Sequence, residues 1–205
     1  QGLTLPYDQK NVRESVLHTI PLRFGVVTDI APDIRLTLHN AGHILGSSII
    51  HLHIGEGYHN IVYTGDFKYG KTMLLEAAAK DFPRVETIIT EGTYSAPGDI
   101  MPSRAEAEQK LVTVINETLS RGGKAMIPVP AVGRAQEIML ILDDYMRRGL
   151  LKEAPVFIEG MISEATAIHT AYPEYLAREV RNTILNQGVN PFESVSYTHL
   201  RAHET

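Results

Sequence analysis

The pattern of apolar residues changes halfway along this chain, and the change limits the folds that the chain can adopt. The first half contains short runs that are apolar or alternate between apolar and polar residues, with Gly, Pro or Asn at their ends. Such runs predict β-strands. The second half alternates helix and strand patterns, which is typical of a parallel sheet flanked by helices. We therefore predict an α/β fold whose two halves meet at a linker, 96–99.

Local signals predict the individual elements. Ser103 and Glu106 form a capping box before an apolar stripe, which predicts a helix that ends at the glycines of 121–123. The other predicted helices are a short one within 68–80, one at 132–148 and helical segments in 163–186. The predicted strands are 26–30, 34–38, 48–54, 59–63, 85–90, 124–129 and 154–158.

Composition excludes several classes of protein. With 205 residues, of which 43% are hydrophobic, the chain can bury a core in one domain or two. It has no cysteine, so a zinc site would have to use His, Asp or Glu. The net charge of −5 provides no overall attraction to nucleic acid. No apolar run approaches the roughly 18 residues that span a bilayer, so we expect no membrane partner and a cytoplasmic protein.

Two polar residues follow predicted strands inside glycine-containing stretches. His43 lies in 39–47 and Asp66 in 63–66, where glycine lets the backbone turn and leaves a side chain facing a cleft. Imidazole and carboxylate groups bind zinc. Taken alone, however, these stretches are more typical of ordinary turns, and Glu91 is more typical of a helix cap or a solvated loop carboxylate.

Several segments considered together resemble one family. Residues 39–47 and 63–66 resemble the third and fourth motifs of metallo-β-lactamase-fold hydrolases, and 90–94 resembles the acidic motif that opens the β-CASP insertion of their nucleic-acid-processing branch. Further segments resemble the archaeal relatives of the cleavage-and-polyadenylation-specificity-factor nuclease, which act in transcription termination. These segments are 102–104, 121–124, 132–137, 160–162, 164–175 and 190–192.

The resemblance implies a fold and a site. Residues 1–95 would be the later part of a metallo-β-lactamase αββα core, and 96–194 most of a β-CASP domain. A complete site would hold two zinc ions, with His43 as a terminal ligand of one and Asp66 as a bridge between them. Glu91 would orient a catalytic histidine further downstream. The expected catalytic residues are therefore Asp66 and Glu91, and the expected metal ligands are His43 and Asp66.

The activity implied is a zinc-dependent ribonuclease that hydrolyses RNA phosphodiesters as an endonuclease, a 5′-to-3′ exonuclease or both. Single-stranded RNA would be its partner, together with the transcription machinery, and a homodimer would form through a C-terminal region outside this chain. One alternative is a non-catalytic β-CASP scaffold, but His43, Asp66 and Glu91 are intact. Another is a hydrolase of small esters, but the segments after Glu91 favour the β-CASP branch.

The ends of the chain predict a fragment. Residues 195–205 match one reading frame of a common transposase-type sequencing adapter, so we expect a non-native tail and exclude its histidines, His199 and His203, as ligands. The remaining ligands of the implied site would then lie outside the chain. We therefore expect the fragment alone to be inactive and to bind zinc poorly.

Three other features have ordinary interpretations. His51 and His53 share one face of a predicted strand, and we expect them on the open face of an antiparallel sheet rather than at a metal. Arg134 starts a predicted helix, where we expect an ion pair with Glu137, or packing against the adjacent strand, in preference to phosphate binding. Pro130 removes a backbone donor at the end of a predicted strand and so alters that loop.

Overall fold

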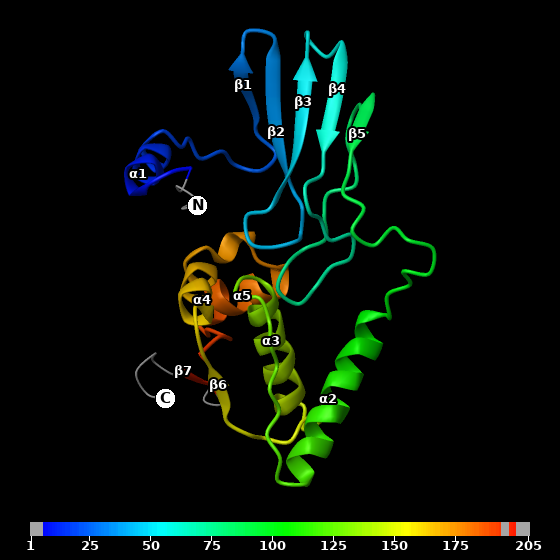
Figure 1. Cartoon of the computed structure of the whole chain (residues 1–205), viewed down its shortest axis with the longest axis vertical. Coiled ribbons are helices and arrows are strands. Elements are labelled where there is room, and N and C mark those ends of the chain that lie inside the picture. The colour runs from blue at the N-terminus through cyan, green and yellow to red at the C-terminus, as the bar shows by residue number, and fades with distance from the viewer. Residues whose placement is uncertain (1–5, 194–196, 200–205) are drawn as a thin grey trace, which may run out of the picture.

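The computed structural model describes residues 6–193 and 197–199, and places a five-stranded sheet above a group of helices (Figure 1). The sheet order is β1 (Val27–Ala31), β2 (Ile34–Asn40), β3 (Ser48–Ile54), β4 (His59–Tyr63) and β5 (Thr87–Ile89). Neighbouring strands are antiparallel, except that β5 is parallel to β4. The strands predicted between 26 and 63 are confirmed, and the predicted bounds of β3 and β4 agree with the structure.

The helical half follows β5 along the chain. It contains α2 (Arg104–Ser120), α3 (Arg134–Arg147), β6 (Val156–Ile158), α4 (Ile162–Ala171), the 3-10 helix η1 (Pro173–Tyr175), α5 (Arg178–Gln187) and β7 (Tyr197–His199). β6 and β7 are parallel. The predicted capping box is confirmed, since Ser103 and Glu106 bond each other's backbone N–H groups at the start of α2. The α/β class is confirmed.

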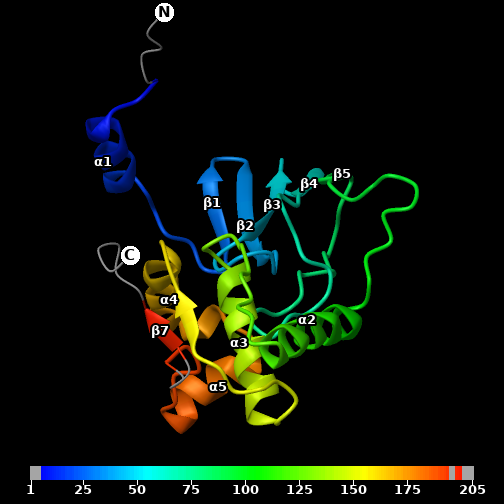
Figure 2. The same ribbon diagram turned by 60° about the horizontal axis from the view of Figure 1, so that its bottom comes forward.

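One helix precedes the sheet. α1 (Gln9–Leu17) begins at Asp8, which caps it, and has no buried residue. It lies apart from the sheet and from the other helices in both views (Figures 1 and 2). No helix in the described part of the chain is long and apolar enough to cross a membrane.

Two predicted elements are wrong. Residues 68–80 form turns and extended chain instead of a helix. Their backbone groups bond to distant partners: Met73 and Leu74 donate N–H groups to Glu137. Residues 124–129 are not assigned to a strand either. Pro128 lacks an N–H group, which weakens any ladder there.

The two faces of the sheet have different surroundings. Register places Val62 and His51 on one face, where segment 76–86 covers them, and Phe82 contacts His51 edge to face. Leu52 and Ile61 are paired on the other face, which is apolar but only half-buried. One face is therefore part of a core, and the other remains partly open to solvent.

The main core joins segments that are far apart in sequence. Leu74 and Leu75, which lie between β4 and β5 in sequence, are 1% and 4% exposed and pack against Met139, Leu176 and Phe192 of the helical half. The Leu74 carbonyl also accepts a hydrogen bond of 2.8 Å from Ala177 N. The segment after β4 is thus built into the helical half.

Part of the expected non-native tail has a structural role here. Tyr197 of β7 packs against the main core and donates its hydroxyl to the Met139 carbonyl. Burial raises the pKa of Tyr197. Residues 195–196 and 200–205 lie outside the described residues, and the origin of 195–205 stays a prediction. The domain limits of 1–95 and 96–194 also stay predictions.

Candidate metal centre

The loop after β2 holds His43 by short backbone contacts. Ser47 Oγ accepts hydrogen bonds from the backbone N–H groups of His43 and Ile44, at 3.1 and 3.2 Å. Asn40 Oδ1 accepts one of 3.0 Å from Gly42 N. Gly42 has a φ of 66°, and a Cβ there would lie 2.7 Å from the Glu76 carbonyl oxygen. Only glycine fits this approach, which fixes the base of the His43 loop.

The loop after β4 carries Asp66 and is tied to its neighbours on both sides. Thr64 N donates to the carbonyl of Ile89 at the end of β5, at 3.0 Å. Lys68 N donates to the carbonyl of Ala41 in the His43 loop, at 2.8 Å. Backbone hydrogen bonds therefore hold the Asp66 loop between β5 and the His43 loop.

The two predicted ligands come together. His43 Nε2 lies 3.9 Å from Asp66 Oδ2, and their side chains are 34% and 68% exposed. Two ligand atoms bound at about 2.0–2.2 Å to a tetrahedral zinc ion lie roughly 3.4 Å apart. The pair therefore fits two positions on one metal ion after a small adjustment.

The pair does not make a complete site. In residues 6–193 and 197–199, no group of three or more His, Cys, Asp or Glu side chains is placed to hold a metal ion. A protein zinc site uses three or four protein ligands. The assignments of His43 and Asp66 as metal ligands, and of Asp66 and Glu91 as catalytic residues, therefore stay predictions.

Glu91 lies beside the Asp66 loop. It accepts hydrogen bonds from Phe67 N at 3.1 Å and from Thr93 Oγ1 at 2.5 Å. The Thr93 hydroxyl, followed by the Phe67 N–H, lowers the pKa of Glu91 and keeps its carboxylate ionised. The observed contacts orient the residue after Asp66. The predicted contact with a downstream histidine stays a prediction.

The start of α3 packs against the His43 loop. A Cβ on Gly133, whose φ is 80°, would lie 3.0 Å from Ile44 Cγ2. Buried Gln136 shapes this helix start, since its side-chain oxygen accepts from Gly133 N at 2.7 Å. Arg134 is exposed there. The N-terminal end of α3 thus contacts the His43 loop at Ile44, the residue after His43.

The predicted ion pair between Arg134 and Glu137 is wrong. Glu137 instead pairs with Arg104 of α2, with 3.3 Å between Nη2 and Oε1. The Glu137 carboxylate also accepts hydrogen bonds from Met73 N and Leu74 N, at 3.0 and 2.7 Å. Its partners lie more than 60 residues earlier in the chain or on another helix, so the i to i+3 spacing gave the wrong partner.

The expectation for the strand histidines is also wrong in part. His51 is 1% exposed and lies under Phe82, rather than on an open face. Its Nε2 is 3.0 Å from the Arg84 carbonyl, and burial lowers its pKa. His53 is half-buried, with Nδ1 2.7 Å from Asn60 Oδ1. The sequence of segment 76–86 did not indicate that it would cover this face of the sheet.

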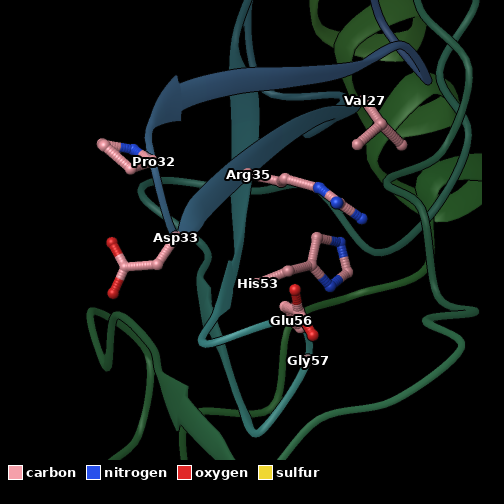
Figure 3. Close-up of a pocket in the computed structure, with 7 residues that line it drawn as sticks. All are labelled: Val27, Pro32, Asp33, Arg35, His53, Glu56 and Gly57. Atoms are coloured by element: carbon pink, nitrogen blue, oxygen red, sulfur yellow. The ribbon is translucent and has the colours of Figure 1, made fainter.

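Two of the surface cavities formed by the described residues can be compared with the positions of the predicted ligands. One of about 280 Å³ is lined by the hairpin residues Val27, Pro32, Asp33, Arg35, His53, Glu56 and Gly57, with Arg35 and His53 side by side (Figure 3). Another of about 350 Å³ lies next to the His43 loop, where Leu45 and Gly46 line it with Tyr172 and Tyr175 of the helical half. Neither cavity is lined by His43 or Asp66.

Sequence reasoning missed the residues that support the site. Asn40, Ser47 and Glu137 shape or hold the ligand loops through backbone contacts. Asn40 and Ser47 lie within or next to the motif around His43, so their position was a usable signal. Glu137 lies in the segment 132–137, but its long-range partners leave no local pattern.

Comparisons with known proteins identify the class. Residues 135–205 match the Beta-Casp domain family. The fold is thus α/β, and its segment 135–205 is similar to the Beta-Casp domain family. With the relatives given next, this match confirms the predicted resemblance.

The individual relatives are archaeal. The chain is 62% identical to the transcription termination factor FttA of Methanothermobacter thermautotrophicus over 93% of its length, and 59% identical to that of Lokiarchaeum sp. over 95%. It is 55% identical to that of Cenarchaeum symbiosum over 98%. It spans 30%, 30% and 31% of these relatives' own lengths, about a third of each.

Proposed function

We propose that this chain is part of an archaeal factor that acts in RNA 3′-end processing and transcription termination, and that cleaves RNA at a zinc site. The observation that carries the proposal is the convergence of His43 and Asp66 at 3.9 Å from two separate loops. High identity to proteins named transcription termination factors supports the cellular role. Such a role would place the protein in the cytoplasm with the transcription machinery.

The residues present would have separate roles at this site. Bound zinc would lower the pKa of a bound water toward neutrality and offset the charge that develops on phosphate oxygens. His43 and Asp66 would hold it, and Glu91 would keep the Asp66 loop in place through Phe67 N. Exposed Arg134, next to the contact between Gly133 and Ile44, offers a guanidinium group for an RNA phosphate.

Single-stranded RNA is the substrate class that we favour. Unpaired bases can stack on aromatic rings. The cavity beside the His43 loop presents Tyr172 and Tyr175, which are 52% and 37% exposed. Aromatic surface beside the loop that carries His43 suits an unpaired strand.

The test uses the full-length protein that contains this chain. We expect His43→Ala and Asp66→Asn each to reduce zinc content and RNA cleavage by more than the roughly 10- to 100-fold that loss of a ligand's hydrogen-bond partner costs. His18→Ala, a change at an exposed histidine of the region after α1, is the control and should leave both unchanged.

The outcomes separate the alternatives. Cleavage that persists after removal of metal with a chelator contradicts the zinc mechanism. A wild-type protein that binds RNA but neither binds zinc nor cleaves is the non-catalytic scaffold. A protein that hydrolyses small esters and leaves RNA intact is the third possibility.

A further inference from the structure

The carboxylate of Glu137 on α3 contacts two backbone N–H groups from a distant segment and the side chain of Arg104. The Glu137 side chain is only 12% exposed. One oxygen accepts from Met73 N and the other from Leu74 N, and Arg104 pairs with the same carboxylate. Two adjacent backbone N–H groups on one ionised carboxylate are charge-assisted hydrogen bonds, which are stronger than neutral ones.

The turn that Glu137 holds continues from the Asp66 loop. Between Asp66 and Met73 the chain is also held by hydrogen bonds from Phe67 N to Glu91 and from Lys68 N to the Ala41 carbonyl, at 3.1 and 2.8 Å. Beyond these two contacts, buried Leu74 donates to Glu137 and accepts from the helical half. The Asp66 loop is therefore fixed at its far end by the carboxylate on α3.

The same helix also supports the other ligand loop. At the N-terminal end of α3, Gly133 approaches Ile44 so closely that a Cβ would lie 3.0 Å from Ile44 Cγ2. One turn later along α3, Glu137 holds Met73 and Leu74. The start of α3 thus contacts the His43 loop, and Glu137 on the same helix holds the turn that follows the Asp66 loop.

We propose that Glu137 is a positioning residue for the candidate metal centre, which acts by clamping the Met73–Leu74 turn and thereby holding Asp66 opposite His43. The inference rests on the proposed zinc site but assigns a role to a residue that does not contact the metal. Replacing the carboxylate with an amide removes the charge and turns one acceptor into a donor that faces a backbone N–H. The turn then loses at least one of its two hydrogen bonds.

The experiment compares Glu137→Gln with wild type in the full-length protein. We expect zinc affinity, measured by chelator competition, to fall about 10- to 100-fold. We also expect an altered visible spectrum of the cobalt-substituted protein, because the arrangement of ligands around the metal changes. Faster amide exchange at Met73 and Leu74 would show that the clamp itself is lost.

Glu108→Gln is the matched control. Glu108 pairs with the same Arg104 and its side chain is 14% exposed, close to the 12% of Glu137, but its partners are Arg104 and Tyr145. Both variants lose a shielded carboxylate beside Arg104, and only Glu137→Gln loses the clamp. We expect the control to keep zinc affinity within about 3-fold and to keep the wild-type cobalt spectrum.

The remaining outcomes overturn the inference. Unchanged zinc affinity in Glu137→Gln, with faster exchange at Met73 and Leu74, would show a clamp that does not position the site. Equal losses in both variants would show general destabilisation. Failure of wild type to bind zinc would refute the proposed function, and with it this inference, before any substitution is compared.

Discussion

At Gly42, the backbone of the His43 loop lies directly against the backbone of segment 76–78. A Cβ there would lie 2.7 Å from Glu76 O and 2.9 Å from Ala78 N. Gly46 in the same loop also has positive φ, but nothing lies within 4 Å of its Cβ position. A substitution at Gly46 therefore causes backbone strain alone, whereas a substitution at Gly42 causes backbone strain and steric overlap.

We expect Gly46→Ala to lower the free energy of unfolding by about 1 kcal/mol, the cost of left-handed backbone. Gly42→Ala should lower it by at least about 1 kcal/mol more, because backbone atoms would have to move. Urea unfolding of both variants measures the difference. Equal losses would mean that segment 76–78 shifts without cost.

At the level of single residues, sequence indicated the two candidate ligands but not the residues that hold their loops. His43 and Asp66 could be placed in loops because glycines and strand ends flank them. Their separation of 3.9 Å depends on backbone contacts such as that from Lys68 N to Ala41 O. Such contacts leave no side-chain pattern, so sequence could not predict them.

Among the elements, β3 carries a histidine that makes the sheet sensitive to acid. His51 is 1% exposed, and its pKa is lowered first by burial and next by nearby His53. Charged groups also face it from segment 80–86: Glu86 opposes the shift, though less strongly than burial drives it. The folded chain therefore binds a proton at His51 less readily than the unfolded chain.

The free energy of unfolding should therefore decrease at acidic pH. Because the folded pKa lies below the unfolded value of about 6.5, stability is fully present above that pH and falls as pH drops through it, by at most about 1.4 kcal/mol per unit for one histidine. We expect His51→Gln to lose less stability than wild type between pH 7.5 and 5.5 in urea unfolding. His18→Gln, at an exposed site, should behave as wild type. Identical pH slopes in all three proteins would contradict the prediction.

Elements with local signals were predictable, and those with distant partners were not. β3 and β4 have the bounds expected from their patterns, and α2 starts at its capping box. The short helix expected within 68–80 is absent from the structure because Met73 and Leu74 give their N–H groups to Glu137. Tertiary contacts replace the local preference there.

For the whole molecule, Leu74 tests how strongly the two halves are joined. It is 1% exposed and belongs to the main core of the helical half, although it lies between the sheet strands β4 and β5 in sequence. We expect Leu74→Ala to lower the free energy of unfolding by about 2–5 kcal/mol. Amide exchange in α5 should rise, because the Leu74 carbonyl accepts from Ala177 next to that helix.

Leu185→Ala is the control for this change. Leu185 lies on α5 and is 59% exposed, so its loss should cost less than about 0.5 kcal/mol. Faster exchange limited to the sheet in Leu74→Ala would show that the core is not shared. The sequence predicted two halves. It could not predict that segment 71–76 would pack in the second half, because an apolar sequence does not identify the distant residues that it will contact.

Because the two halves share a core, the exposed stretch between them can accept inserted sequence. Residues 94–102 are exposed throughout, and they lie between Thr93, which donates to Glu91, and Ser103, which caps α2. Leu74 and Leu75, and not this stretch, hold the halves together. Exposed, loosely packed segments are where added sequence is best tolerated. The stretch is therefore a permissive site, at which a tag or a whole reporter domain can be inserted without separating the ligand loops from the helix that supports them.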